Sequence, residues 1–258
     1  GLPVIRRAAC FLLAILLFSP VPVLAENKMA LVIGNSGYKD APLRNPENDA
    51  QLLGNTLESL GFKTHVYLNL DQRGLRRAVA DYGAALEAAG PDTVSLVYFA
   101  GHGIQIGNQN YLIPVASQIT HERDVPIEAV SADEVMKSLA FAQTRLNIII
   151  LDACRNNPFP REGQRSIGGT RGLVRMEPPK GAFILYSAGA GQTALDRLSD
   201  QDANPNSVFT RALLQRLNEP GMSLHEMAKL VRRDVQQLAS TVNHDQFPSY
   251  YDQMSGEL

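Results

Sequence analysis

Residues 94–103 read Val-Ser-Leu-Val-Tyr-Phe-Ala-Gly-His-Gly, and residues 146–154 read Leu-Asn-Ile-Ile-Ile-Leu-Asp-Ala-Cys. Each stretch contains a mostly apolar run, at residues 94–99 and 148–151, which is typical of a parallel-sheet strand buried on both faces. Each stretch ends near a reactive side chain, His102 in the first and Cys154 in the second. Because ligands of open α/β sheets bind beyond the carboxyl ends of the strands, we expect these two side chains to meet at one edge of the sheet.

Further strands and helices follow from the rest of the pattern. Apolar runs at residues 29–33 and 183–186 predict central strands, and an alternating stretch at residues 62–68 predicts a strand near the sheet edge. Apolar residues at helical spacing and capping signals predict helices that begin near Asn45, Leu75, Ser131, Ser207 and Ser223. The apolar stripe of the first helix is expected to include Leu60, and the sequences that begin at Ser131 and Ser223 match the capping-box pattern. Strands that alternate with helices predict an α/β fold with a mostly parallel sheet.

The first 25 residues have the features of a secretory signal. Arg6 and Arg7 precede a short apolar run at residues 8–18, and Val23-Leu24-Ala25 offers small residues for cleavage. We therefore expect a signal peptide at 1–25, one domain at 26–258, and a periplasmic or secreted location. An uncleaved membrane anchor is the alternative.

Charge and cysteine content limit the classes of partner. The chain carries 24 basic and 26 acidic residues, and no basic stripe stands out, so nucleic acid and anionic membranes are poor candidates. Once the signal is removed we expect no stable association with a membrane. Of the two cysteines, Cys10 lies in the signal segment and Cys154 does not, so a mature chain has no internal disulfide.

The residue types at the two strand ends suit acyl transfer. A thiol becomes a strong nucleophile when a neighbouring base favours the thiolate, and imidazole titrates near neutral pH. Cys154 is thus the candidate nucleophile and His102 the candidate general acid/base. The amides of Gly103 and Cys154 are candidate donors to the oxyanion that forms during the reaction. The other histidines lack metal-binding spacing, so no metal site is predicted.

These two motifs carry a family resemblance. Residues 98–103 and 152–155 resemble the catalytic motifs of caspases, metacaspases and bacterial orthocaspases, whose histidine lies roughly 50 residues upstream of the cysteine. Three further stretches resemble these families: residues 31–35 their first strand and the loop after it, residues 43–50 the stretch that leads into the first helix, and residues 183–187 the strand that supplies one wall of the specificity pocket. The resemblance implies a caspase-like, three-layer (caspase-hemoglobinase) fold with about six mostly parallel strands and helices on both faces. It also implies a cysteine endopeptidase that needs no cofactor and acts on a peptide or protein.

The resemblance also implies a specificity pocket, which here is acidic. Asp152 stands where caspases have glutamine, and Asp196 falls at the position of their specificity arginine; Ser187 is expected in the same pocket. Carboxylates attract a cationic side chain, so we expect cleavage after Arg or Lys rather than after Asp. Three alternatives stay open: the two aspartates are structural, Arg44 and Arg155 neutralise the pocket, or cleavage follows Asp.

The segment after the nucleophile lacks apolar periodicity and predicts a long surface loop at residues 155–181. It offers basic residues at which the peptidase could cleave itself: Arg161, Arg165, Arg171, Arg175 and Lys180. A loop that folds over the site with solvated arginines is the equal alternative. By resemblance to metacaspases, we expect a monomer, and calcium activation stays open because no EF-hand spacing occurs.

Two other classes of protein were weighed. A binding module could keep the fold without catalysis, although both reactive side chains are present. A nucleotide-binding protein is disfavoured, because residues 34–37 match neither a P-loop nor a dinucleotide fingerprint.

Overall fold

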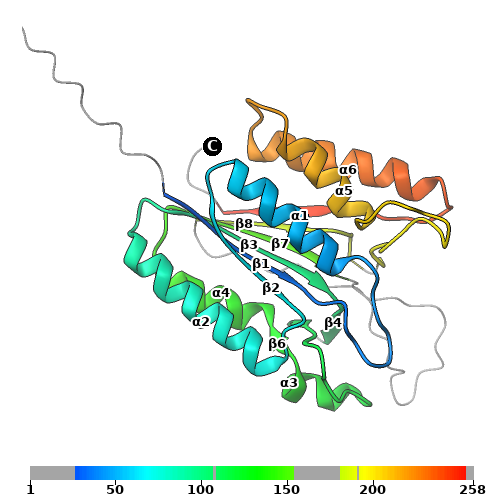
Figure 1. The fold of residues 1–258 in the computed structure, drawn as a ribbon, viewed down its shortest axis with the longest axis horizontal. Helices are drawn as coiled ribbons and strands as arrows, with labels where there is room; N and C mark the ends of the chain where they lie inside the picture. The colour runs from blue at the N-terminus through cyan, green and yellow to red at the C-terminus, as the bar shows by residue number, and fades with distance from the viewer. Residues whose placement is uncertain (1–26, 107–108, 154–180, 191, 254–258) are drawn as a thin grey trace, which may run out of the picture.

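A computed structural model describes residues 27–106, 109–153, 181–190 and 192–253. The expected signal peptide, Cys154, Arg155 and the five candidate self-cleavage residues lie outside the described residues. A six-stranded sheet forms the centre, in the order β2-β1-β3-β7-β8-β9 (Figure 1). Its strands are β1 (Lys28–Gly34), β2 (Lys63–Leu68), β3 (Val94–Gly101), β7 (Leu146–Ala153), β8 (Ala182–Tyr186) and β9 (Ser249–Asp252).

The strand pairing agrees with the predicted architecture. β2, β1, β3, β7 and β8 run parallel, and β9 pairs with β8 in the antiparallel sense. All eight residues of β3 and of β7 are buried, as expected for central strands covered on both faces. β2, the strand with alternating polarity, lies at the edge. The prediction of a mostly parallel sheet of about six strands is confirmed.

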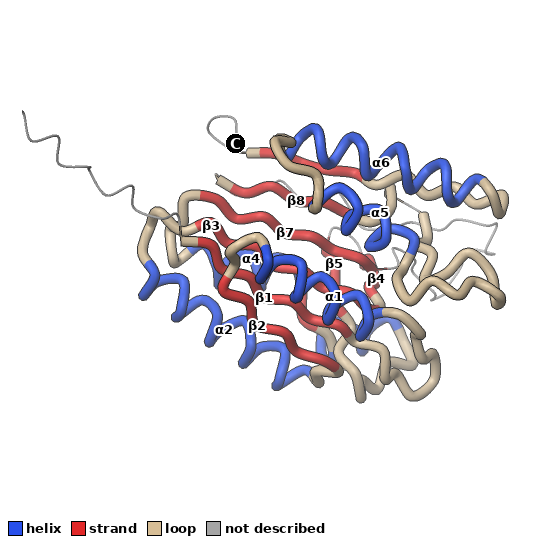
Figure 2. The backbone as a smooth tube through the Cα atoms, turned by 45° about the horizontal axis from the view of Figure 1, so that its top comes forward, coloured by secondary structure: helices blue, strands red, loops and turns tan. Residues whose placement is uncertain are grey.

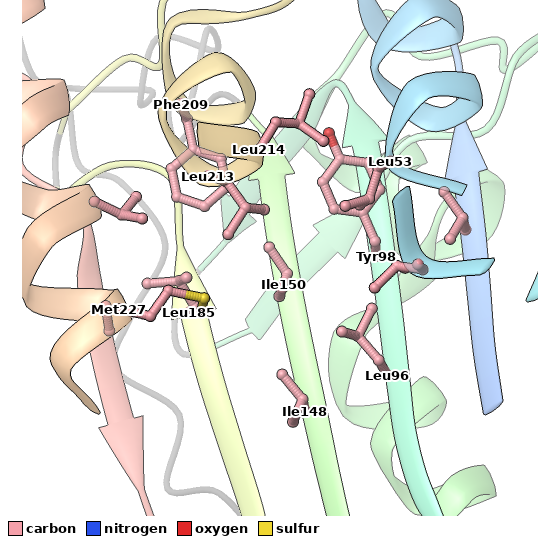
Figure 3. Close-up of a cluster of buried hydrophobic side chains, with 14 of the residues drawn as sticks. Leu53, Leu96, Tyr98, Ile148, Ile150, Leu185, Phe209, Leu213, Leu214 and Met227 are labelled. Carbon is pink, nitrogen blue, oxygen red and sulfur yellow. The ribbon is translucent and has the colours of Figure 1, made fainter. Parts of the chain in front are cut away.

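Helices cover both faces of this sheet and make three layers (Figures 1 and 2). One face carries α1 (Pro46–Ser59), α5 (Val208–Leu217) and α6 (Leu224–Ser240), and the other carries α2 (Gln72–Ala89) and α4 (Ala132–Ala140). Successive residues of a strand point to opposite faces. Leu96 and Tyr98 therefore join one apolar core and Val97 and Phe99 the other. Figure 3 shows the first of these cores, with side chains of the sheet beneath those of α1, α5 and α6.

A second, small sheet follows β3 directly. It contains β4 (Gly103–Ile106), β5 (Gln109–Leu112) and β6 (Val130–Ser131), with a short helical segment η1 (Glu122–Asp124) and α3 (Val125–Glu128) before β6. The sequence analysis did not predict these strands, because two to four residues are too few for a periodic pattern. The hairpin of β4 and β5 begins one residue after His102, so it bears directly on the position of that residue.

Three local predictions need correction. Asn45 precedes α1 but does not cap it with its side chain; its Nδ2 donates to the Asp196 main-chain oxygen at 2.6 Å. Ser131 accepts from the Glu134 amide, but Glu134 binds Arg76 instead of completing a capping box. Leu60, expected in the apolar stripe of α1, is 38% exposed because the helix ends just before it. The capping box at Ser223 is present as predicted.

Among the residues that the structure describes, no helix combines the length and the apolar composition that crossing a bilayer requires.

Candidate active site

The register of β3 and β7 sets two strand ends side by side. Ala100 lies opposite Asp152, and Gly101 lies opposite Ala153. His102 is the next residue after Gly101. Cys154 is the next residue after Ala153 in the sequence, where the described part of β7 stops. His102 and Cys154 are therefore each the next residue after one member of the Gly101–Ala153 pair.

The imidazole of His102 is held by a main-chain carbonyl. Its Nε2 lies 2.7 Å from the oxygen of Ala41. A carbonyl oxygen only accepts hydrogen bonds, so Nε2 carries the hydrogen in this contact. In the neutral ring Nδ1 is then the unprotonated nitrogen. This arrangement leaves Nδ1 as the ring nitrogen that is able to accept a proton.

The amide of Gly103 points away from its neighbouring strand. Gly103 lies opposite Leu112, and the bond between these strands runs from the Ile113 amide to the His102 oxygen at 3.0 Å, one residue outside that pair. This pattern makes Gly103 and Leu112 a non-hydrogen-bonded pair, in which both amides face outward. The Gly103 amide is therefore not used in the pairing with β5.

A pocket opens beside these strand ends and contains three carboxylates. Asp49 comes from α1, Asp152 from β7 and Asp196 from the loop that follows β8. The residues that line the pocket are Leu43, Pro46, Asp49, Ala100, Gly101, Asp152, Ala194, Leu195, Asp196 and Ser207. Three acids from three separate elements thus converge on one small space.

Asp152 is anchored at the buried end of this pocket. It is 7% exposed, and its Oδ2 accepts hydrogen bonds from the hydroxyls of Ser207 at 2.5 Å and Thr210 at 2.8 Å. The pKa of Asp152 is raised to about 6, mainly by burial and in part by the charge of Asp196, while the hydrogen bonds from the two hydroxyls oppose this shift. The carboxylate has a fixed orientation and lacks a charged partner among these contacts.

The surroundings of Asp49 disfavour its ionised form more strongly than those of Asp152 do. It is 1% exposed; Oδ1 accepts from Asn206 Nδ2 at 2.9 Å and from the Ser207 amide at 3.0 Å, whereas Oδ2 is buried without a hydrogen bond. Burial, followed by the charge of Asp152, raises the pKa of Asp49 to about 8. A cation that entered the pocket would relieve both effects by favouring the ionised form.

Asp196 lies nearer the surface and is held by main-chain donors. Its carboxylate accepts from the amides of Arg44 at 3.0 Å and Asn45 at 3.3 Å. Burial raises the pKa of Asp196, and these amides partly offset that effect. The Arg44 guanidinium contacts the main-chain oxygen of Asp202 at 3.5 Å and is not part of the pocket lining.

Comparison with known proteins decides the family. The family model described as "Caspase domain" matches residues 27–258, which is nearly the whole chain. The chain belongs to the caspase domain family. The resemblance inferred from the motifs around His102 and Cys154 is thereby confirmed at the level of the family.

Two curated relatives share part of this caspase domain. They are mucosa-associated lymphoid tissue lymphoma translocation protein 1 of Homo sapiens, 31% identical over 133 residues, and its homolog in Mus musculus, 30% identical over 133 residues. Each alignment covers 51% of this chain and 15% of the relative. This chain thus aligns with a small portion of much longer proteins.

The predicted pocket residues do not all line the pocket of this caspase domain. Asp152 and Asp196 do. Ser187 is fully buried at the end of β8, near Asp152; its hydroxyl makes no hydrogen bond of normal geometry, and its main chain bonds Leu151 and Gln246. Ser187 is therefore buried close to Asp152 and does not itself line the pocket.

Two site residues were missed by the sequence analysis. Asp49 was missed although a signal was present: it lies four residues before Leu53 and eight before Leu57, so it extends the buried stripe of α1. An acid on an apolar helix face indicates a special role. Ala41 gave no signal, since it acts through its main-chain oxygen.

In the described part of the caspase domain, no group of three or more His, Cys, Asp or Glu side chains is arranged to hold a metal ion.

Replacing Asp49 with asparagine is expected to stabilise the domain. With a pKa near 8 in the fold, against about 4 in an unfolded chain, Asp49 binds a proton on folding, so stability falls as pH rises through that interval. Asp49→Asn removes this loss and a buried charge, and should raise the free energy of unfolding at neutral pH by about 1 kcal/mol or more.

Thermal unfolding at about pH 6 and about pH 8 checks this expectation. The midpoint of Asp49→Asn should lie above that of wild type, with a larger gap at the higher pH. Asp92→Asn, which alters an exposed carboxylate before β3, is the matched control and should leave the midpoint unchanged. A lower midpoint for Asp49→Asn at both pH values would show that the carboxylate stabilises the fold.

Proposed function

We propose that this chain is a cysteine endopeptidase that cleaves peptide bonds after arginine or lysine. The observation that carries the proposal is the convergence of Asp49, Asp152 and Asp196 on one pocket next to His102. Family membership and the position of Cys154 in the sequence support the choice of nucleophile. A guanidinium or ammonium group would find charge-assisted acceptors there and would favour the ionised form of the acids, whereas an aspartate side chain would meet the like charges of Asp152 and Asp196.

The reaction can be balanced with the residues named. Cys154 gives its proton to Nδ1 of His102, and the thiolate attacks the carbonyl carbon that follows the cationic side chain. The oxyanion that forms accepts from the amides of Gly103 and Cys154. His102 then passes the proton to the leaving amine, and the C–N bond breaks. Water, deprotonated by His102, hydrolyses the resulting thioester and restores the thiol.

The same chemistry extends the proposal to self-processing. Cleavage after Arg161, Arg165, Arg171, Arg175 or Lys180 would follow from the same preference for a cationic side chain. We further propose export after loss of residues 1–25, action as a monomer in the periplasm or outside the cell, and chemistry without a resident cofactor.

A set of fluorogenic peptides that differ only in the residue before the cleaved bond tests the proposal. The protein of residues 26–258 should hydrolyse Arg and Lys peptides and leave the Asp peptide intact, and Cys154→Ala should hydrolyse none. Intact-mass analysis of both proteins would show self-processing in the wild type alone. Equal, negligible hydrolysis by both proteins would favour a binding module. Preference for the Asp peptide would reverse the assignment of the pocket.

A further inference from the structure

The hydroxyl group of Tyr38 links two main-chain positions, one of which belongs to the candidate catalytic histidine. It accepts a hydrogen bond from the His102 amide at 3.0 Å and donates one to the Ile113 main-chain oxygen at 2.8 Å. Since Ile113 also donates its amide to the His102 oxygen, residues 102 and 113 are tied together twice. These two residues flank the hairpin of β4 and β5, so the Tyr38 hydroxyl connects the start of the hairpin to its end.

The ring of Tyr38 also contacts the imidazole. The two ring centroids lie 4.4 Å apart with an interplanar angle of 58°. The hydroxyl approaches the chain so closely that a Cβ added at Gly101 would lie 2.5 Å from it, closer than atoms can pack. Tyr38 is 8% exposed and belongs to a small apolar cluster with Ile104 and Ile113. Its side chain is therefore fixed on several sides.

The segment that carries Tyr38 holds the imidazole at a second point. Ala41, three residues later, supplies the oxygen that accepts from Nε2 of His102. This segment is itself braced: the amides of Tyr38 and Leu43 both donate to the oxygen of Ser36. Asn69 fixes its start, because Oδ1 accepts from the amides of Ser36 and Gly37 at 2.9 Å each. The loop at residues 36–43 thus contacts His102 at three points: the main-chain amide, the imidazole ring and the ring nitrogen Nε2.

We propose that Tyr38 is a positioning residue for the reaction, because its hydroxyl fixes the main chain of His102 and so the direction of Nδ1. The inference rests on the proposed peptidase function and adds a residue outside the catalytic pair and the acidic pocket. Tyr38 neither touches the pocket nor titrates in the reaction; it acts through His102.

The consequence of losing the hydroxyl follows from its two bonds. In Tyr38→Phe the ring remains, while the His102 amide and the Ile113 oxygen lose their partner. The imidazole then samples orientations that do not serve proton transfer, and a misplacement of about 1 Å can cost about 10²-fold in rate. We expect kcat to fall about 10- to 100-fold while KM stays within about twofold, because the three acids are untouched.

Tyr82→Phe is the matched control. The Tyr82 hydroxyl is also buried and hydrogen-bonded, to the Met29 oxygen at 3.0 Å and to Ser95 at 2.8 Å, but it lies on α2 within the core of the sheet. Removing it costs comparable buried hydrogen bonds without contact to His102. Both variants should lose some thermal stability, and only Tyr38→Phe should lose kcat.

The test combines Arg-peptide kinetics with the pH dependence of Cys154 alkylation by iodoacetamide, for wild type and both variants. The expected result is a lower kcat and a shift of the alkylation profile by about 0.5 pH unit or more for Tyr38→Phe alone. Equal kcat and equal profiles for Tyr38→Phe and Tyr82→Phe, with an active wild type, would overturn the inference and leave the function standing. A wild type without Cys154-dependent hydrolysis would overturn both.

Discussion

Replacing His102 with alanine is expected to lower kcat for an Arg peptide by about 10³-fold or more. The variant removes both the base that accepts the thiol proton and the acid that protonates the leaving amine. The hydrogen bond of Nε2 to Ala41 disappears with it, but the pocket acids keep their positions because none of them bonds His102. KM should therefore change much less than kcat.

His225→Ala is the control for this prediction. His225 also forms a polar contact, with Asp252 at 2.5 Å, and packs edge-on to Phe183 at the start of β8. The start of β8 lies at the opposite end of the sheet from the carboxyl ends of β3 and β7, where the candidate site lies. Hydrolysis by His225→Ala should match the wild type. If His102→Ala kept more than about a tenth of the wild-type kcat, His102 would not be the general acid/base.

Replacing Asp152 with asparagine is expected to lower kcat/KM for the Arg peptide by about 100-fold. Asparagine has the same shape, and its oxygen can still accept from Ser207 and Thr210. The change thus removes a buried charge with little disturbance of packing. Asp49 and Asp196 remain, which keeps the loss below what removal of the whole acidic set would give.

A peptide with citrulline in place of arginine separates charge from shape. Citrulline keeps the length of the side chain and lacks its charge, so the wild type should strongly prefer arginine. In Asp152→Asn the preference should shrink by about the same factor as the loss in kcat/KM. Asp92→Asn serves again as the control. An unchanged preference in Asp152→Asn would mean that this carboxylate does not face the substrate side chain.

The fold was predictable because its central strands carry a strong pattern. β3 and β7 are buried on both faces, so both strands appear in the sequence as continuous apolar runs with polar residues at one end. The edge strand β2 shows its exposure as alternation. The small sheet was not predictable, since β6 has two residues and β4 and β5 have four each.

The candidate site was predictable in part, for reasons that differ from residue to residue. His102 is marked by its place after an apolar run between two glycines. Asp196 came from family resemblance, yet what holds it is tertiary: the amides of Arg44 and Asn45 lie more than 150 positions away in the sequence. Such contacts leave no local pattern. The failed cap at Asn45 has the same origin, because its side chain binds the Asp196 main chain instead.

The three acids also illustrate how a site can oppose stability. Burial raises the pKa of Asp49 and of Asp152, which means that the folded domain disfavours their charged forms. A cationic substrate side chain would compensate these charges at the moment of binding. The same carboxylates that are expected to select arginine are thus expected to weaken the empty domain, as Asp49→Asn tests.

The most direct test of the account is covalent labelling of Cys154 by peptidyl chloromethyl ketones that end in arginine or in aspartate. Mass spectrometry of the labelled protein, with peptide mapping, reports both the residue modified and the rate for each reagent. The account predicts one adduct on Cys154, formed at least about 100-fold faster by the arginine reagent and strongly slowed in His102→Ala. Equal rates for the two reagents, a faster aspartate reagent, or labelling of Cys154 that is indifferent to His102 would contradict it.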